Sequence, residues 1–322
     1  MYSETNAPKG MLFFNFLSIL GLTLFAVFNF IGMLFFFDGT IGTSLLITLG
    51  LTLLLTALLI LMCVAKAKDS HFALWRTVEF SALALFIIAA GASFFGPVRS
   101  LCIMGSKGDI LAAARADRAA MDTLIAKYEA QEGEAITNTI TGLKSSTGQL
   151  LRNTTLREWC KKNELLDSKG YVDDEYINNF KRNQKKVLLE NDFPNIKTNT
   201  ETLLDQHIGI IESWNIFQMP AQPAALTQLA EETAKQLTDL SNRADLPKIE
   251  WGDIVEENQT FTYDAPSMKV AQAISKVGYG KWYAWLILII IHTLTLCSYF
   301  WTLRSRKTLI KEKAITNGST IL

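Results

Sequence analysis

Five polar or ionisable residues interrupt otherwise apolar stretches of this chain and are the first candidates for chemistry. They are Asn15, Asn29, Arg76, Glu79 and His292. A carboxylate or an imidazole is costly inside a membrane, and such groups often mark a path for protons or ions. Arg76 precedes Glu79 by three residues, however, so both lie on one face of a helix. Because long charged side chains near a helix end reach the membrane surface, this spacing favours an interfacial ion pair over an ion pathway.

His292 and the two asparagines have simpler interpretations. No second histidine or cysteine lies three or four residues from His292, so we expect a hydrogen-bonded interior histidine rather than a metal ligand. Asn15 and Asn29 can each hydrogen-bond across helices, which contributes about 0.6 to 2 kcal/mol per bond. We therefore expect the asparagines to set the register between helices.

Motifs of known catalytic machinery are missing from the sequence. It contains no Gly-rich phosphate loop, no HExxH, no CxxC and no GxSxG. His207, in the polar part of the chain, has isoleucines around it, which indicates a packed position. We therefore expect a protein that is not an enzyme and that uses no cofactor or metal.

Four apolar runs hold the polar candidates. They cover residues 11–37, 41–65, 72–97 and 282–303. A hydrocarbon core of about 30 Å is crossed by roughly 20 helical residues, so each run predicts a transmembrane helix. The first run is much longer than the apolar part of a signal peptide and has no small-residue cleavage site, so we interpret it as a retained helix. In the third run, the small residues 89–93 predict the tightest helix packing.

Basic residues predict the orientation of these helices. The loop 38–40 has no lysine or arginine, whereas Lys66, Lys68 and Arg76 lie between the second and third runs. Five more basic residues follow the fourth run. By the positive-inside rule, the N-terminal segment 1–10 and the basic tail 304–322 are cytoplasmic, and the polar block 104–280 lies outside.

The polar block 104–280 is expected to be a mainly α-helical domain inserted between the third and fourth membrane helices. Its 20 basic and 26 acidic residues give a net charge of −6, which argues against a nucleic-acid partner. Apolar spacings of three and four predict five helices, and residues 267–277 are expected to lead helically into the fourth apolar run. We expect the five helices from Ser106 to about Leu143 with a break among Gly133, Gly142 and Gly148, then at 150–166, from Asp173 to Pro194, from Thr198 or Thr200 to Trp214, and at 224–243. Residues 260–263 could form a short strand.

The helix 224–243 carries a leucine stripe made of Leu226, Leu229, Leu237 and Leu240. Only this side of the helix requires burial, because its other faces are charged or amide-bearing. The stripe either packs in the core of the domain or docks a second copy or another protein. Cys102 and Cys160 are the two cysteines expected outside, where an oxidising compartment would permit a disulfide. Cys160 would have to fold back to the membrane boundary for that bond, which the sequence leaves open.

These features predict an all-α, multi-pass integral membrane protein, and the absence of a disulfide framework suggests a bacterial inner membrane. The first functional hypothesis is a scaffold or assembly subunit of an envelope-spanning complex, which docks other envelope proteins or a second copy through the outer domain. The alternative is a sensor that binds a small ligand in the outer bundle and signals through a separate partner. A third hypothesis, an ion or solute channel, depends on Glu79 and His292 alone.

Overall fold

The computed structural model describes residues 10–68, 71–146 and 153–302. Most of the expected N-terminal segment and the whole basic tail 304–322 therefore lie outside the described residues. The chain divides into two compact units. The first unit comprises residues up to 108, 216–221 and from 274 onwards, and the second comprises residues 109–215 and 222–273.

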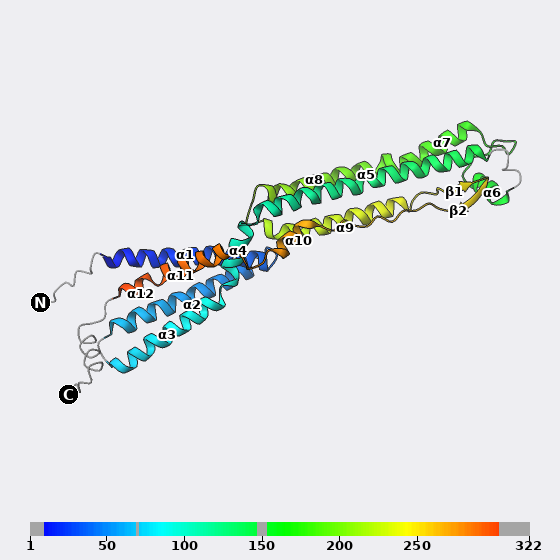
Figure 1. The fold of residues 1–322 in the computed structure, drawn as a ribbon. Helices are drawn as coiled ribbons and strands as arrows, with labels where there is room; N and C mark the ends of the chain where they lie inside the picture. The colour runs from blue at the N-terminus through cyan, green and yellow to red at the C-terminus, as the bar shows by residue number, and fades with distance from the viewer. Residues whose placement is uncertain (1–9, 69–70, 147–152, 303–322) are drawn as a thin grey trace, which may run out of the picture. The chain divides into compact units, whose positions relative to one another are not determined.

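The first unit contains three helices that are long and apolar enough to cross a membrane (Figure 1). They are α1 (Gly10–Phe36), α2 (Ile41–Ala67) and the combined span Ala73–Met104, which is made of α3 (Phe72–Ala92) and α4 (Phe95–Met104). The expected run 72–97 is therefore interrupted after residue 92 and continues further than predicted. Pro97 explains the interruption, because a proline ring collides with the carbonyl of the residue four positions earlier.

The fourth apolar run forms two short helices, α11 (Trp282–Thr295) and α12 (Cys297–Trp301). The Ser18 hydroxyl of α1 donates to the carbonyl of Leu294 at 3.3 Å and accepts from the backbone N–H of Ser298 at 2.8 Å. These two backbone groups would bond to each other in a continuous α-helix. The inserted side chain therefore explains the interruption at Leu296.

Glycines mark the closest helix contacts of the first unit. A Cβ added at Gly32 would lie 1.8 Å from the carbonyl oxygen of Gly96, so α1 and α4 touch backbone to backbone. A Cβ at Gly21 would lie 2.6 Å from the backbone nitrogen of Thr295 on α11. Gly91, within the stretch predicted to pack most tightly, has no such neighbour within 4 Å. The prediction for residues 89–93 is therefore wrong, since the small residues that matter lie on α1 and α4.

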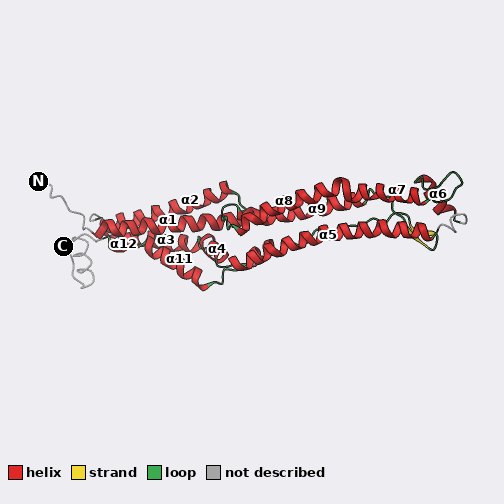
Figure 2. Ribbon diagram, turned by 90° about the horizontal axis from the view of Figure 1, so that it is seen from above, coloured by secondary structure: helices red, strands yellow, loops and turns green. Residues whose placement is uncertain are grey.

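The second unit consists mainly of long helices, of which α8 and α9 pack side by side (Figure 2). Two apolar clusters fill it, one around Tyr128 and Leu237 and the other around Leu143 and Leu246. Its helices are α5 (Lys107–Ser145), α6 (Thr154–Lys162), α7 (Asp174–Lys185), the π-helical turn η1 (Lys186–Asn191), α8 (Asp192–Glu212) and α9 (Gln222–Ser241). Helix α10 (Lys269–Lys276) begins in this unit, which extends to residue 273. The short 3₁₀ helix η2 (Met219–Ala221) belongs to the first unit.

Two expected boundaries differ in the second unit. Pro194 was predicted to end a helix, but the chain stays helical from α7 through η1 into α8. The wider π-helical turn directly before Pro194 accommodates a residue that cannot donate to a carbonyl of the preceding turn. Helix α5 runs through Gly133 and Gly142 and ends at Ser145. A glycine weakens a helix by about 1 kcal/mol relative to alanine, and packing offsets this at Gly142, where an added Cβ would lie 2.7 Å from the Ile249 carbonyl oxygen.

The strands also lie elsewhere than predicted. Strands β1 (Lys248–Glu250) and β2 (Asp253–Glu256) pair antiparallel, whereas residues 260–263 are not a strand. The backbone N–H groups of Phe261 and Tyr263 donate to the hydroxyls of Ser241 and Thr238 on α9, each at 3.0 Å. Side-chain acceptors therefore replace the neighbouring strand that the segment would need.

Candidate functional site

The ion pair between Arg76 and Glu79 forms as its spacing predicts, with 3.0 Å between Nη1 and Oε2. It is not an exposed interfacial pair, however, because the Glu79 side chain is only 2% exposed. The other carboxylate oxygen, Oε1, accepts a 2.7 Å hydrogen bond from the Tyr299 hydroxyl of α12. A helix that lies far along the chain covers the carboxylate, which the local spacing could not reveal.

Lys66 on α2 extends this polar cluster. Its Nζ donates to the backbone carbonyl of Tyr299 at 2.7 Å and lies 4.6 Å from the centre of the Tyr299 ring. Glu79, Arg76, Lys66 and Tyr299 thus connect α2, α3 and α12. Both carboxylate oxygens of Glu79 have partners from this chain, so the cluster fits a cross-link between helices better than an ion path.

The other intramembrane polar residues divide into bonded and unbonded groups. Asn29 donates to the Thr48 hydroxyl on α2 at 3.1 Å, and Asn15 accepts from the Ser298 hydroxyl at 3.0 Å, so both asparagines connect helices. His292 differs from the expectation, because neither ring nitrogen has a hydrogen-bond partner within the part of the chain that the structure describes. Its ring instead lies 5.5 Å from that of Phe25, between centroids.

The four residues of the leucine stripe are buried in the second unit, where none is more than 6% exposed. Leu237 and Leu240 pack with Leu124, Tyr128 and Phe193 from α5 and α8. This burial favours packing inside the domain over an open docking face. His207 also has an internal partner, since its Nδ1 lies 2.8 Å from Oε1 of Gln222.

Both cysteines of the disulfide hypothesis are free and buried, Cys102 on α4 and Cys160 on α6. Burial raises the pKa of the Cys160 thiol to about 12. A thiol with so high a pKa is a poor nucleophile, because the thiolate is the reactive form. Cys160 therefore acts as a small apolar residue in its core cluster.

Two buried carboxylates on α5 were missed in the sequence. Glu132 accepts a 3.0 Å hydrogen bond from the Tyr263 hydroxyl, and burial raises the pKa of this carboxyl group. Asp117 accepts from the backbone N–H groups of Lys269 at 2.5 Å and Val270 at 2.9 Å, so it caps the start of α10. A usable signal existed for Glu132, because it follows Tyr128 by four residues on the apolar face of α5.

Among the described residues outside the membrane helices, the most exposed aromatic residue is Trp251, with 92% of its surface accessible. Trp251 and Gly252 form the two-residue turn between β1 and β2, because Glu250 pairs with Asp253. Both turn residues have positive φ, 54° and 83° respectively. A type I′ hairpin turn requires such angles and favours Asn-Gly, whereas a bulky residue rarely adopts them. In the sequence, the signal of this turn is a residue-glycine pair between two short β-like stretches.

The hairpin that carries Trp251 is attached firmly to the second unit. Ile249 is buried in the apolar cluster around Leu143, and Asn153 donates to Asp253 with 2.7 Å between Nδ2 and Oδ1. Exposed charged residues surround the turn, namely Lys248, Glu250, Asp253, Glu256 and Glu257. A rigid base therefore presents an open indole within a predominantly acidic surface.

Within the described residues, no three histidine, cysteine or acidic side chains are grouped so that they could hold a metal ion. No protein-family model, curated protein or solved structure matches this chain. The hairpin turn at Trp251 is the candidate functional site, because it combines full exposure, a rarely adopted backbone conformation and firm attachment.

Proposed function

We propose that this protein is a membrane-anchored scaffold or assembly subunit that docks an envelope protein through the hairpin turn at Trp251. The observation that carries the proposal is the almost complete exposure of Trp251 in a left-handed backbone conformation. That conformation is unfavourable by about 1 to 2 kcal/mol for a residue with a side chain, so a binding role would explain why tryptophan is present. Tryptophan is also enriched among the residues that dominate binding energy in protein interfaces.

The proposed partner presents an apolar pocket with basic side chains around it. The indole would fill the pocket, and a lysine or arginine over its face would add a cation–π contact. The carboxylates of Glu250, Asp253, Glu256 and Glu257 complement such a surface, and Lys248 is already paired with Glu250 at 2.9 Å. The buried leucine stripe, which the sequence offered as a docking element, has no part in this proposal.

The anchoring part of the proposal has four membrane helices. The broken segment α11–α12 would be the fourth, because it runs through apolar sequence from Trp282 to Trp301 and packs against α1 and α2. Basic residues near the second loop and in the tail favour cytoplasmic termini, so that the second unit would lie outside. A bacterial inner membrane fits this arrangement.

The test is purification of the full-length protein from its native cells in mild detergent, with quantification of the proteins that accompany it. Wild type is compared with Trp251→Asn and with Tyr176→Ala. Asparagine suits a type I′ turn, so the first variant removes the indole while it keeps or strengthens the hairpin. Tyr176 is an exposed aromatic residue in the regular helix α7 and serves as the matched control.

We expect a stoichiometric envelope protein to accompany wild type and Tyr176→Ala but to be lost from Trp251→Asn. If Trp251→Asn retains that protein in full, the turn is not the docking site. If no protein accompanies wild type and a small molecule is retained instead, the sensor alternative replaces the scaffold. Circular dichroism and thermal unfolding of each variant confirm that the second unit remains folded.

A further inference from the structure

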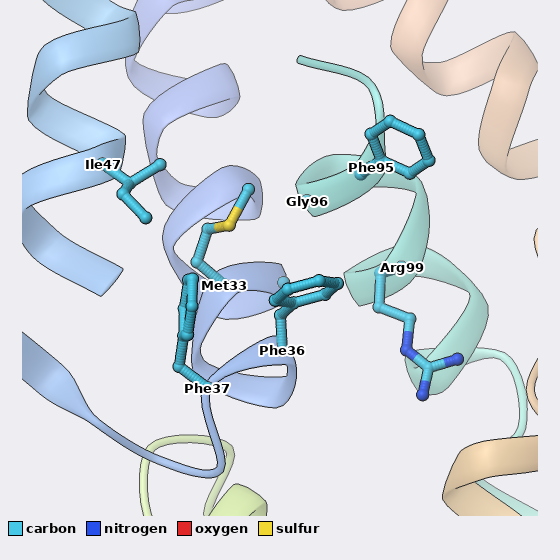
Figure 3. A pocket seen from close by; sticks show the side chains of 8 residues that line it. Met33, Phe36, Phe37, Ile47, Phe95, Gly96 and Arg99 are labelled. Carbon is cyan, nitrogen blue, oxygen red and sulfur yellow. The ribbon is translucent and has the colours of Figure 1, made fainter. Parts of the chain in front are cut away.

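A pocket of about 310 Å³ lies between α1, α2 and α4 in the first unit (Figure 3). Its walls are formed by Met33, Phe36, Phe37, Ile47 and Phe95, and Arg99 lies at one side. Phe36 and Phe95 are 63% and 47% exposed, so the pocket opens on the outer surface of the helices. All three helices belong to segments that are long and apolar enough to cross a membrane.

The backbone contact between α1 and α4 gives this pocket a fixed shape. Gly32 and Gly96 both line it, and an added Cβ at Gly32 would lie 1.8 Å from the Gly96 carbonyl oxygen. The chain is interrupted between α3 and α4, so α4 can pack on α1 at this level while α2 remains further away across the pocket. The hollow therefore depends on glycines and a helix break rather than on mobile side chains.

The lining determines what can fill the hollow. Water in a cavity needs two to four polar partners, which phenylalanine, methionine and isoleucine side chains do not supply. Against a lipid bilayer, the available apolar material is an acyl chain, and a hollow left empty would forfeit dispersion contacts on every wall. An acyl chain therefore suits this pocket better than water or a polar solute.

Arg99 supplies charge complementarity at one end. Its guanidinium donates to the backbone carbonyls of Ile274, at 2.8 Å, and Val277. These carbonyls hold the group in place, and a guanidinium with five N–H donors can bind a phosphate as well. In Figure 3 the guanidinium points away from the apolar walls, toward the end of the helices where the loop after Phe37 lies.

We propose that this pocket is a binding site for one membrane phospholipid, with an acyl chain between α1, α2 and α4 and its phosphate on Arg99. The site goes beyond general contact with the bilayer, because it selects a lipid that has both a chain and a phosphate. The bound lipid fills the hollow beside the contact of Gly32 with Gly96 and so stabilises the packing of α4.

The experiment places the full-length protein in phosphatidylcholine nanodiscs with a trace of phosphatidylglycerol that carries a diazirine on one acyl chain. After photolysis, labelled peptides are quantified by mass spectrometry. We expect labelling to concentrate on the peptides that contain Met33, Phe36 and Phe95. Equal labelling along all exposed faces of α1, α2 and α3 would overturn the proposal.

Variants with a filled pocket provide the matched comparison. Ile47→Trp should fill the hollow and lower the labelling of those peptides several-fold. Leu46→Trp adds the same side chain one residue earlier, where the native residue is exposed outside the pocket, and should leave the labelling unchanged. Unchanged labelling in a folded Ile47→Trp protein would overturn the proposal, and folding is checked by thermal unfolding.

A second probe tests the phosphate in the wild-type protein, where no substitution can disturb folding. Diacylglycerol with the same diazirine chain but no phosphate should label the pocket several-fold less than phosphatidylglycerol in the wild-type protein. In Arg99→Gln, the two probes should label equally, whereas Arg99→Lys should retain part of the preference. If both probes label the wild-type pocket equally, Arg99 does not bind a lipid phosphate and the proposal fails.

Discussion

The Tyr299 hydroxyl donates a 2.7 Å hydrogen bond to Oε1 of Glu79, which joins α12 to α3 through a buried carboxylate. A hydrogen bond to a charged group contributes about 1.5 to 3 kcal/mol, because the charge strengthens it and a buried oxygen has no water to replace the donor. The short helix α12 is therefore stabilised in part by its hydrogen bond to the Glu79 carboxylate.

Tyr299→Phe removes this hydroxyl and leaves the rest of the ring. We expect the protein in detergent to lose about 1 to 3 kcal/mol of stability, because Oε1 of Glu79 loses the partner from α12. Thermal unfolding measures the loss. Phe300→Leu changes the neighbouring exposed ring and should have little effect. Equal melting temperatures for Tyr299→Phe and wild type would show that the bond contributes nothing.

Glu132→Gln should change how the stability of the second unit depends on pH. Burial raises the pKa of Glu132 in the folded protein, so the folded state binds more protons than the unfolded state between the two pKa values. Stability contributed by Glu132 is therefore lost as pH rises through that window. Glutamine has no proton to lose and still accepts from Tyr263. We expect the variant to be more stable than wild type at neutral pH, with a flatter profile, in denaturant titrations from pH 4 to 8.

Asp117→Ala should loosen the start of α10. Both carboxylate oxygens of Asp117 accept backbone N–H groups there, and their removal leaves two donors unsatisfied, at a cost of about 1 to 3 kcal/mol each. Hydrogen exchange read by mass spectrometry should accelerate at residues 269–273. Asp122→Ala, an exposed position on the same helix, is the control and should not change this exchange. Slow exchange in both variants would exclude the cap.

Leu229→Asp combined with Leu237→Asp should unfold the second unit. Both leucines are buried, and an unpaired carboxylate in an apolar core costs several kcal/mol. Limited proteolysis should then cut α9 quickly. Gln236→Asp adds a carboxylate on the exposed side of α9 and should remain resistant. A folded double mutant that fails to associate would instead identify the stripe as an interface.

The orientation can be read with a reporter that is active only in the cytoplasm. Fused after Leu322 it should be active, and inserted after Gly170 in the turn before α7 it should be silent. The distribution of basic residues is the physical reason. Activity at Gly170 would place the second unit in the cytoplasm and remove the basis for an envelope partner.

The sequence predicted the apolar helices well, because 46 charged residues lie in 104–280 and only six in 11–96. This separation of charged from apolar residues is visible in the sequence without knowledge of the tertiary structure. Helix interruptions were harder to predict, since Pro194 was expected to end a helix that instead continues into α8 through the π-helical turn η1. The break at Leu296 depends on a serine from α1 that is distant in the chain.

Glu79 shows the same limit for site residues. Its pairing with Arg76 is local and was predicted from spacing, whereas its burial depends on Tyr299, which is 220 residues away. On spacing alone, Glu79→Gln is almost neutral, because exposed ion pairs contribute about 0 to 1 kcal/mol. Because the Glu79 carboxylate is buried, the small contribution of an exposed ion pair no longer applies to it. The pair Trp251-Gly252 indicates a turn in the sequence, but no local pattern distinguishes an exposed tryptophan from a core one, so the exposure of Trp251 was not predicted.

The separation between Glu79 and Tyr299 also has a consequence for biosynthesis. A ribosome adds roughly 5 to 20 residues per second, so about 10 to 45 s pass between the synthesis of these two residues. Throughout that interval α3 carries a carboxylate whose final partner does not yet exist. Arg76, made three residues earlier, pairs with Glu79 from the start, so the nascent helix carries no isolated charge before translation reaches the tyrosine.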